Sequence, residues 1–169
     1  MKNPPPATTG PHAGFSLLEL VVVMAIIALL AAMILPLFLS KIPREQIEES
    51  MALISSVNAK VTSYYNSKLA VGEPALPASN EAAGANPPES YAGVFVESIT
   101  IVNGAVNVKF RPTANGKLAG KIVSWRPVVS GNNPISEWIC GYKTVASSLQ
   151  TGGTNATNVT RDAVPLRCL

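Results

Sequence analysis

The 169-residue chain has little histidine, cysteine, aromatic content or charge. One histidine and two cysteines are too few for the zinc and iron–sulfur sites that clustered ligands build. Only 14% of the residues are charged and 47% are hydrophobic, a composition that excludes an intrinsically disordered chain. The net charge of +3 is too small to identify a partner by itself.

The sequence also lacks the residue groups that catalysis needs. It shows no Ser-His-Asp set, no glycine-rich phosphate loop and no clustered pair of carboxylates. The one histidine, His12, lies in a proline-rich N-terminal stretch. We therefore expect neither an enzyme nor a bound metal or cofactor.

One long apolar segment accounts for much of the hydrophobic content. Residues 15–39 contain a single charged residue, Glu19. As a helix, this segment would be about 37 Å long, enough to cross a bilayer core of about 30 Å. No second apolar segment approaches the length of about 18 residues that a span needs, so a multi-span membrane protein is excluded.

Two ordinary interpretations explain this segment only in part. A secretory signal peptide has an apolar region of about 7–15 residues without an acidic residue, and a cut after Ala32 would release it. A plain single-pass anchor explains the length of the segment. It does not explain Glu19, because a carboxylate inside lipid is costly.

A third interpretation uses the order of the residues before the apolar run. The segment Gly14–Leu20, GFSLLEL, places a glycine, an aromatic residue and a glutamate in fixed register. It resembles the prepilin cleavage and methylation motif of type IV pilins and their relatives. The resemblance implies that a prepilin peptidase cuts between Gly14 and Phe15, and that the new amine of Phe15 is methylated. A leader of residues 1–14, including His12, would be removed.

The acidic Glu19 needs a counter-charge in apolar surroundings, unless it lies at the membrane interface. Cleavage creates a cationic amine at Phe15, four residues upstream, and residues four apart share one helix face. Between subunits, the amine of one chain can pair with Glu19 of the next. In the low dielectric of a helix bundle, an unpaired charge is heavily penalised, so only one axial offset between the two subunits neutralises both charges. The resemblance implies the same role for Phe15 and Glu19 in subunit assembly.

Apolar residues occur on every side of this helix, which indicates burial all round, in lipid or in a bundle of identical helices. Near the end of the run, Pro36 removes one helical hydrogen bond and predicts a kink or a local opening. A tolerated membrane proline and a flexible point for helix repacking are both consistent with this position.

The remaining sequence predicts a helix followed by a sheet. From Lys41 to about Leu69 the pattern is helical, with an interruption at Pro43, and residues 71–90 form an irregular loop. The apolar face of this helix is Ile47, Met51, Ile54, Val57, Val61 and Tyr64 or Tyr65. Four β-rich runs follow, at residues 94–102, 105–110, 118–129 and 135–142. Asn-Gly between the first two runs is a strong hairpin signal.

These elements predict an α+β fold, in which a long N-terminal helix packs on a four-stranded antiparallel sheet. This is the pilin fold that the resemblance implies. We expect three parts: a leader of residues 1–14, a membrane and filament-core helix of residues 15–39, and a head of residues 40–169.

The two cysteines, Cys140 and Cys168, are 28 positions apart near the C-terminus. In a head outside the cytoplasm a disulfide is expected, and closing this loop contributes about 3–4 kcal/mol in the chain-entropy model. The segment 147–158 between them is polar and has too few apolar residues to pack in place on its own, so a disulfide that attaches it to the sheet makes physical sense. The pattern resembles the C-terminal disulfide loop of type IV pilins. It weighs against secretion-system pseudopilins, whose major members usually lack it and use calcium.

The C-terminal half is basic, with eight basic and three acidic residues from Ser90 to Leu169. The simplest interpretation is a solvated sheet face. The alternative is a weak electrostatic surface for DNA, acidic glycans or host surfaces. Lys109 and Arg111 would point to one face if their strand extends that far.

Taken together, the residues and the resemblance predict a structural subunit of a bacterial type IV pilus, serving adhesion, twitching motility or DNA uptake. Its partners would be copies of itself, the prepilin peptidase and the inner-membrane assembly machinery. It would be a single-pass inner-membrane protein before assembly and part of an extracellular filament afterwards. The alternatives are a minor pilin that binds DNA or surfaces, and a type II secretion pseudopilin.

Overall fold

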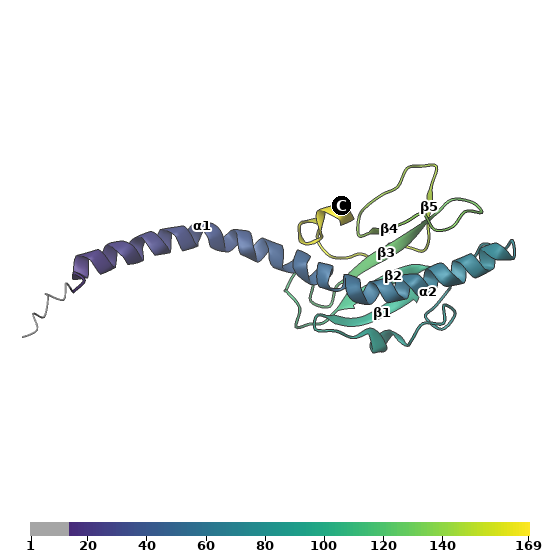
Figure 1. Cartoon of the computed structure of the whole chain (residues 1–169), viewed down its shortest axis with the longest axis horizontal. Coiled ribbons are helices and arrows are strands. Elements are labelled where there is room, and N and C mark those ends of the chain that lie inside the picture. Colours follow the sequence, from purple (N-terminus) through teal and green to yellow (C-terminus); the bar gives the residue numbers. More distant parts are fainter. Residues whose placement is uncertain (1–13) are drawn as a thin grey trace, which may run out of the picture. The chain divides into compact units, whose positions relative to one another are not determined.

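The computed structural model describes residues 14–169, which divide into two compact units between Phe38 and Leu39. Helix α1 (Leu17–Glu49) begins in the first unit and ends in the second, and α2 (Met51–Ala70) follows it. All strands belong to the second unit, which we call the head (Figure 1). The expected α+β class is confirmed.

Helix α1 begins at Leu17 because Ser16 caps it. The Ser16 hydroxyl oxygen accepts the Glu19 N–H at 3.1 Å, and the Ser16 carbonyl accepts the Leu20 N–H at 3.1 Å. Serine at the cap with glutamate three residues later is a capping-box sequence, and the helix dipole also favours an acidic first turn. Phe15 lies before the helix in the uncleaved chain, and the closeness of its amine to Glu19 after cleavage stays a prediction.

The two prolines of α1, Pro36 and Pro43, both lie inside an uninterrupted helix. The interruption predicted at Pro43 is therefore wrong, and the break between α1 and α2 falls at Ser50. Ser50 keeps helical dihedral angles, φ −65° and ψ −16°, and its hydroxyl donates to the Ile47 carbonyl at 2.6 Å. Pro43 is buried, so packing in the head offsets the hydrogen bond that it removes. The flexible point at Pro36 remains a prediction about the assembling subunit.

The predicted apolar face of the second helix is confirmed. In Figure 1, α2 lies across one face of the sheet. The buried residues of this face are Ile47, Ile54, Val57, Val61 and Tyr65, and Met51 packs against them. The sequence left open whether Tyr64 or Tyr65 belongs to this face, and the structure shows that it is Tyr65, which is 3% exposed. The core below this face is closed by large buried side chains of the sheet, among them Phe110 and Trp125.

The sheet is antiparallel and has the order β1-β2-β3-β4, with a short fifth strand paired to β3. The strands are β1 (Val96–Val102), β2 (Ala105–Phe110), β3 (Ile122–Val129), β4 (Glu137–Cys140) and β5 (Gln150–Thr151). The hairpin turn between β1 and β2 is confirmed, with φ of 49° at Asn103 and 85° at Gly104, as a type I′ turn requires. The third strand begins later than predicted, because Gly120, at φ 68°, belongs to a turn.

Strand β3 is the centre of the sheet. Val128 pairs with Glu137 of β4 and with Thr151 of β5, so these two strands lie on opposite edges of β3. On the edge of β3 that pairs with β4, the residues that β4 does not reach are covered by a segment that is not a strand and includes Thr157 and Asn158. There the Asn158 amide oxygen accepts the Ile122 N–H at 2.7 Å, and its backbone N–H donates to the Ile122 carbonyl at 3.1 Å.

The outer edge of β1 is closed by one buried side chain, Asn80. Its amide oxygen accepts the Ile101 N–H at 2.7 Å, and its amide nitrogen donates to the Ile99 carbonyl at 3.0 Å. The same nitrogen also donates to the Asn86 carbonyl at 3.0 Å. A side-chain amide thus takes the place of a neighbouring strand and blocks an edge that would otherwise invite pairing between chains.

We predict that Asn80→Ala lowers the free energy of unfolding of the head by about 2 kcal/mol, because buried backbone groups lose their partner. Asn86→Ala is the matched control, since the Asn86 side chain is exposed and only its backbone carbonyl is used. Denaturant titration of the full chain in detergent micelles measures both changes. Equal stabilities of the two variants would contradict the role given to Asn80.

Candidate functional site

The first unit presents an apolar helix with nothing packed on it. All side chains from Phe15 to Pro36 are exposed, with Leu18 at 74% and Met33 at 63%. The stretch Leu17–Pro36 has a mean hydropathy of 2.9 and meets the length and composition needed to cross a membrane. Soluble monomers rarely expose apolar patches of more than a few hundred Å², so this surface requires lipid or other helices around it.

The predicted processing residues lie at the start of this helix. Gly14 and Phe15 are exposed, non-helical residues, and Glu19 is the acidic residue of the first turn. Within residues 14–169, none of the ion pairs includes Glu19. The rest of the predicted leader, including His12, lies outside the described residues.

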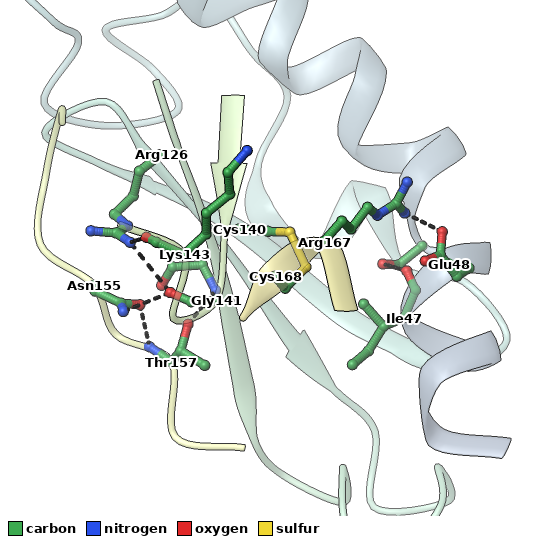
Figure 2. The surroundings of a disulfide bond; sticks show 12 residues. Ile47, Glu48, Arg126, Cys140, Gly141, Lys143, Asn155, Thr157, Arg167 and Cys168 are labelled. Carbon is green, nitrogen blue, oxygen red and sulfur yellow. Dashed lines mark hydrogen bonds and ion pairs between the residues drawn. A yellow bond between two sulfur atoms is a disulfide. The ribbon is translucent and has the colours of Figure 1, made fainter. Parts of the chain in front are cut away.

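The two cysteines are joined by a disulfide that links the end of β4 to the short helix Leu166–Cys168. Both cysteines are buried, and Figure 2 shows their surroundings. The Cys168 carbonyl accepts the backbone N–H groups of Tyr142 and Lys143. Gly141 has φ 57°, and an added Cβ would lie 2.7 Å from the Cys168 carbonyl oxygen, so the backbone segments at Gly141 and Cys168 approach each other closely.

The segment before Cys168 is held by more than the disulfide. The Asn155 amide donates to the Gly141 carbonyl at 2.7 Å, and the Thr157 hydroxyl oxygen accepts the Ser124 N–H at 3.0 Å. Val159 is fully buried. Our expectation that this polar segment cannot hold itself in place is therefore wrong, because its polar side chains bond directly to the edge of β3.

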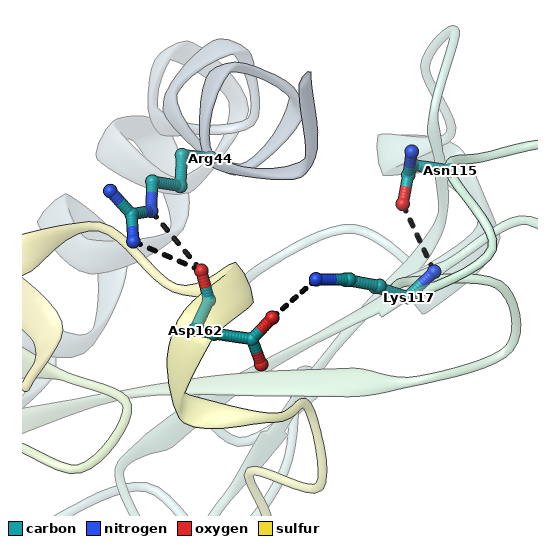
Figure 3. Close-up of polar contacts among 4 residues, drawn as sticks. All are labelled: Arg44, Asn115, Lys117 and Asp162. Atoms are coloured by element: carbon teal, nitrogen blue, oxygen red, sulfur yellow. Dashed lines mark hydrogen bonds and ion pairs between the residues drawn. The ribbon is translucent and has the colours of Figure 1, made fainter. Parts of the chain in front are cut away.

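Residues 161–168, which we call the C-terminal strap, bind the head end of α1. The Arg44 guanidinium donates to the Asp162 carbonyl at 3.0 and 3.2 Å, and the Asp162 carboxylate pairs with Lys117 (Figure 3). One helical turn later, Glu48 pairs with Arg167 beside the disulfide (Figure 2). The strap thus joins α1 to β4 through two polar contacts and one covalent bond.

Comparison with known proteins places this geometry in a family. Residues 11–35 match the family model of the prokaryotic N-terminal methylation motif, and residues 44–168 match that of the pilin of bacterial filaments. The chain belongs to the pilin family. This pilin therefore has the two parts that its family models describe, one for the N-terminal helix and one for the head.

The curated relatives include type IV pilins. The chain is 29% identical over 162 residues to the type IV major pilin protein PilE1 of Neisseria gonorrhoeae, covering 92% of this pilin and 86% of the relative. It is 33% identical over 130 residues to a fimbrial protein of Neisseria meningitidis serogroup B, covering 76% and 72%. It is 31% identical over 150 residues to the fimbrial protein EcpC of Eikenella corrodens, covering 87% and 94%.

The basic residues singled out from the sequence are engaged within the head of this pilin. Lys109 pairs with Glu97 at 2.8 Å, and the Arg111 Nε donates to the carbonyls of Gly93 and Val96 at 3.0 and 3.1 Å. Strand β2 ends at Phe110, so the condition for Lys109 and Arg111 to share a strand face is not met.

Two basic residues nearer the disulfide, Arg126 and Arg161, also make contacts within the head. Arg126 donates to the carbonyls of Gly141 and Lys143 at 3.3 and 3.1 Å, and burial lowers the pKa of its guanidinium (Figure 2). The Arg161 guanidinium lies 4.5 Å from the centre of the Tyr142 ring, in a cation–π contact.

Sequence reasoning missed three groups of residues that shape these sites. The Ser16 cap could have been predicted from the sequence, because the spacing of Ser16 and Glu19 is a capping-box signature. The contact between Arg44 and Asp162 joins residues 118 positions apart, and no local pattern announces it. Asn80 likewise looked like an ordinary loop residue.

The ion pair of the strap predicts a pH dependence. Hydrogen bonds from Lys117, and then Thr160, lower the pKa of Asp162 from 3.8 to about 2. Because the folded pKa is depressed, the stabilisation is present above the ordinary carboxyl pKa and is lost as the pH falls toward 2. We predict that Asp162→Asn, which keeps the carbonyl that Arg44 contacts, lowers the denaturation midpoint at pH 7 and not at pH 2.

Denaturant titration of both full chains in detergent at pH 7, 4 and 2 measures this difference. Glu97→Gln removes another carboxylate that pairs with a lysine, Lys109, at 2.8 Å, between β1 and β2, and is the matched control. A gap between wild type and Asp162→Asn that persists unchanged at pH 2 would refute the assignment.

Proposed function

We propose that this pilin is the polymerising structural subunit of a bacterial type IV pilus, with its N-terminal helix in the filament core and its head on the outside. The observation that carries the proposal is the helix over Leu17–Pro36, apolar and exposed all round, with its one carboxylate, Glu19, in the first turn. A surface of this kind needs an apolar environment on every side.

Energetics support the use of one helix in two environments. Burying each large apolar side chain contributes about 1.5–3 kcal/mol relative to water. Lipid and a bundle of identical helices both provide that burial, so transfer from membrane to filament exchanges one apolar contact for another. The subunit is then a single-pass inner-membrane protein before assembly and an extracellular one afterwards.

The cap at Ser16 supports processing between Gly14 and Phe15. A peptidase needs an extended backbone, and both residues of that bond precede the first helical residue, Leu17. Cleavage by the prepilin peptidase would leave an amine, then methylated, on Phe15, just outside the helix. We infer that this amine pairs with Glu19 of a second subunit and that the pair sets the axial stagger of the filament.

The structure favours bulk polymer over a specialised binding module. The cations proposed for a DNA surface, Lys109 and Arg111, are held by a carboxylate and by backbone carbonyls of their own chain. Adhesion, twitching motility and DNA uptake are then activities of the assembled filament, driven by the inner-membrane assembly machinery with its separate ATPases.

Processing is tested by intact mass and N-terminal peptide mapping of protein sheared from cells. We expect a chain that begins at N-methyl-Phe15 and is two hydrogens lighter than its reduced form, because Cys140 and Cys168 are bonded. Gly14→Val should keep the leader, since a bulky side chain then stands at the cut bond. A soluble, unmethylated chain beginning after Ala32 would show that the segment is a signal peptide.

Assembly is tested by Glu19→Ala. This variant keeps the backbone N–H that Ser16 accepts, so the helix start is preserved. We predict normal membrane insertion and cleavage, but at least about a hundredfold fewer sheared filaments, because an unpaired amine would be buried in the bundle. Glu45→Ala, which removes an exposed carboxylate from the head end of α1, is the control. Normal filament numbers in Glu19→Ala would contradict charge pairing.

A further inference from the structure

Two of the asparagines in this chain, Asn103 and Asn115, are followed directly by glycine. Asparagine is one of the residues that degrade chemically, and it does so when the backbone nitrogen of the next residue attacks its side-chain carbonyl carbon. Glycine in that next position favours the attack, because it has no Cβ to hinder its nitrogen or its backbone rotation. The same dipeptide therefore occurs twice, and the structure around each copy decides how it behaves.

The pair Asn103-Gly104 is fixed in the turn between β1 and β2. Gly104 is buried, and its N–H donates to the Pro77 carbonyl at 2.8 Å. An added Cβ at Gly104 would lie 2.9 Å from the Leu76 side chain, so this part of the backbone has little room to rotate. The Gly104 nitrogen is thus engaged in a hydrogen bond and shielded from the base that must remove its proton.

The pair Asn115-Gly116 lies in open surroundings, in the loop between β2 and β3. Gly116 is exposed, and beyond its chain neighbours an added Cβ would meet no heavy atom within 4 Å. Among the residues that the structure describes, none accepts a hydrogen bond from the Gly116 N–H. Water and hydroxide can therefore reach this nitrogen, and the backbone at Gly116 has room to rotate.

The Asn115 side chain is held beside the same nitrogen. Its amide oxygen accepts the Lys117 N–H at 3.0 Å, which closes a ring around the peptide bond between Asn115 and Gly116. The Asn115 N–H donates to Gln46 Oε1 at 2.9 Å, and the Asn115 carbonyl accepts the Leu118 N–H at 2.7 Å. These bonds restrict the conformations that precede attack, and the bond to the amide oxygen makes the carbonyl carbon more electrophilic.

We infer that Asn115 is a site of spontaneous deamidation in the folded head. The Gly116 nitrogen gives its proton to hydroxide and forms a bond to Asn115 Cγ. The bond between Cγ and Nδ2 breaks, and Nδ2 takes a proton from water and leaves as ammonia. Water then opens the cyclic imide at either of its carbonyls, which yields aspartate or isoaspartate. The sum consumes one water molecule and releases one ammonia, with no oxidant, reductant or cofactor.

The product would add a charge near the contacts between α1 and the strap. A carboxylate at position 115 lies two residues from Lys117, whose ammonium pairs with Asp162 (Figure 3). Isoaspartate also lengthens the backbone between the N–H that is bonded to Gln46 and the N–H of Lys117. Deamidation therefore acts on a loop that contacts both α1 and the strap. This inference does not depend on the proposed function, because the chemistry requires only a folded head.

The test is peptide mapping of the full-length protein after incubation in detergent micelles at 37 °C, at pH 6 and at pH 8. Cleavage after lysine places Asn103 and Asn115 on different peptides, which end at Lys109 and Lys117. Mass spectrometry detects the exchange of an amide for an acid, and chromatography separates isoaspartate. We expect Asn115 to convert on the order of tenfold faster than Asn103, and faster at pH 8, because the attacking nitrogen must lose its proton.

Controls separate the effect of the fold from that of the dipeptide. In the chain unfolded by urea, both asparagines should convert at rates within about threefold of each other, because both dipeptides are then exposed. In the folded chain, Gly116→Ala should slow the conversion of Asn115 on the order of tenfold, since the new Cβ hinders the nitrogen. That Cβ enters open space, so the fold is kept. Thr113→Ala, an exposed change in the same loop, should leave the rate unchanged.

Three outcomes would overturn the inference. Equal rates at Asn103 and Asn115 in the folded chain would show that the fold does not select Asn115. Survival of Asn115 in the folded chain, with conversion in urea, would show that the fold protects it. An unchanged rate in Gly116→Ala would exclude attack by the Gly116 nitrogen. None of these results bears on filament formation, which tests the proposed function separately.

Discussion

A helix that is apolar on every side has no stable place in water, and this constraint governs the rest of the molecule. The exposed stretch Leu17–Pro36 must be surrounded first by lipid or by other helices. All side chains of this stretch are exposed. The head has its own core, which is closed by α2, the sheet and the strap.

Exposed sheet edges invite pairing with the edges of other chains. This head covers its edges with side chains in place of strands. Asn80 bonds to the outer edge of β1, and Asn158 covers the part of β3 that β4 does not reach.

Local patterns in the sequence predicted the helices, the hairpin and the disulfide pair. They succeeded where one residue type dominates its surroundings, as at Asn103-Gly104 and in the buried face around Val57 and Val61. They failed at Pro43, where tertiary packing keeps a helix that local propensity would break. They also missed β5, which has two residues and exists because β3 offers it an edge.

The candidate sites divide in the same way. The processing motif is contiguous, so its register was visible in the sequence. The strap was not, since Arg44 meets Asp162 and Glu48 meets Arg167 only after the sheet has brought the ends of the head together. The same is true of Asn80, whose partners Ile99 and Ile101 are defined by the pairing of β1 with β2.

The strap also gives the head a mechanical property. A pull along α1 reaches the head at Arg44 and Glu48, which lie one turn apart and both bind the same short segment. These contacts share the load in parallel, and the Cys140–Cys168 bond carries it onward into β4 and the neighbouring strand β3. Part of a pull along α1 is therefore borne by β4 and β3, instead of passing only from α1 into α2.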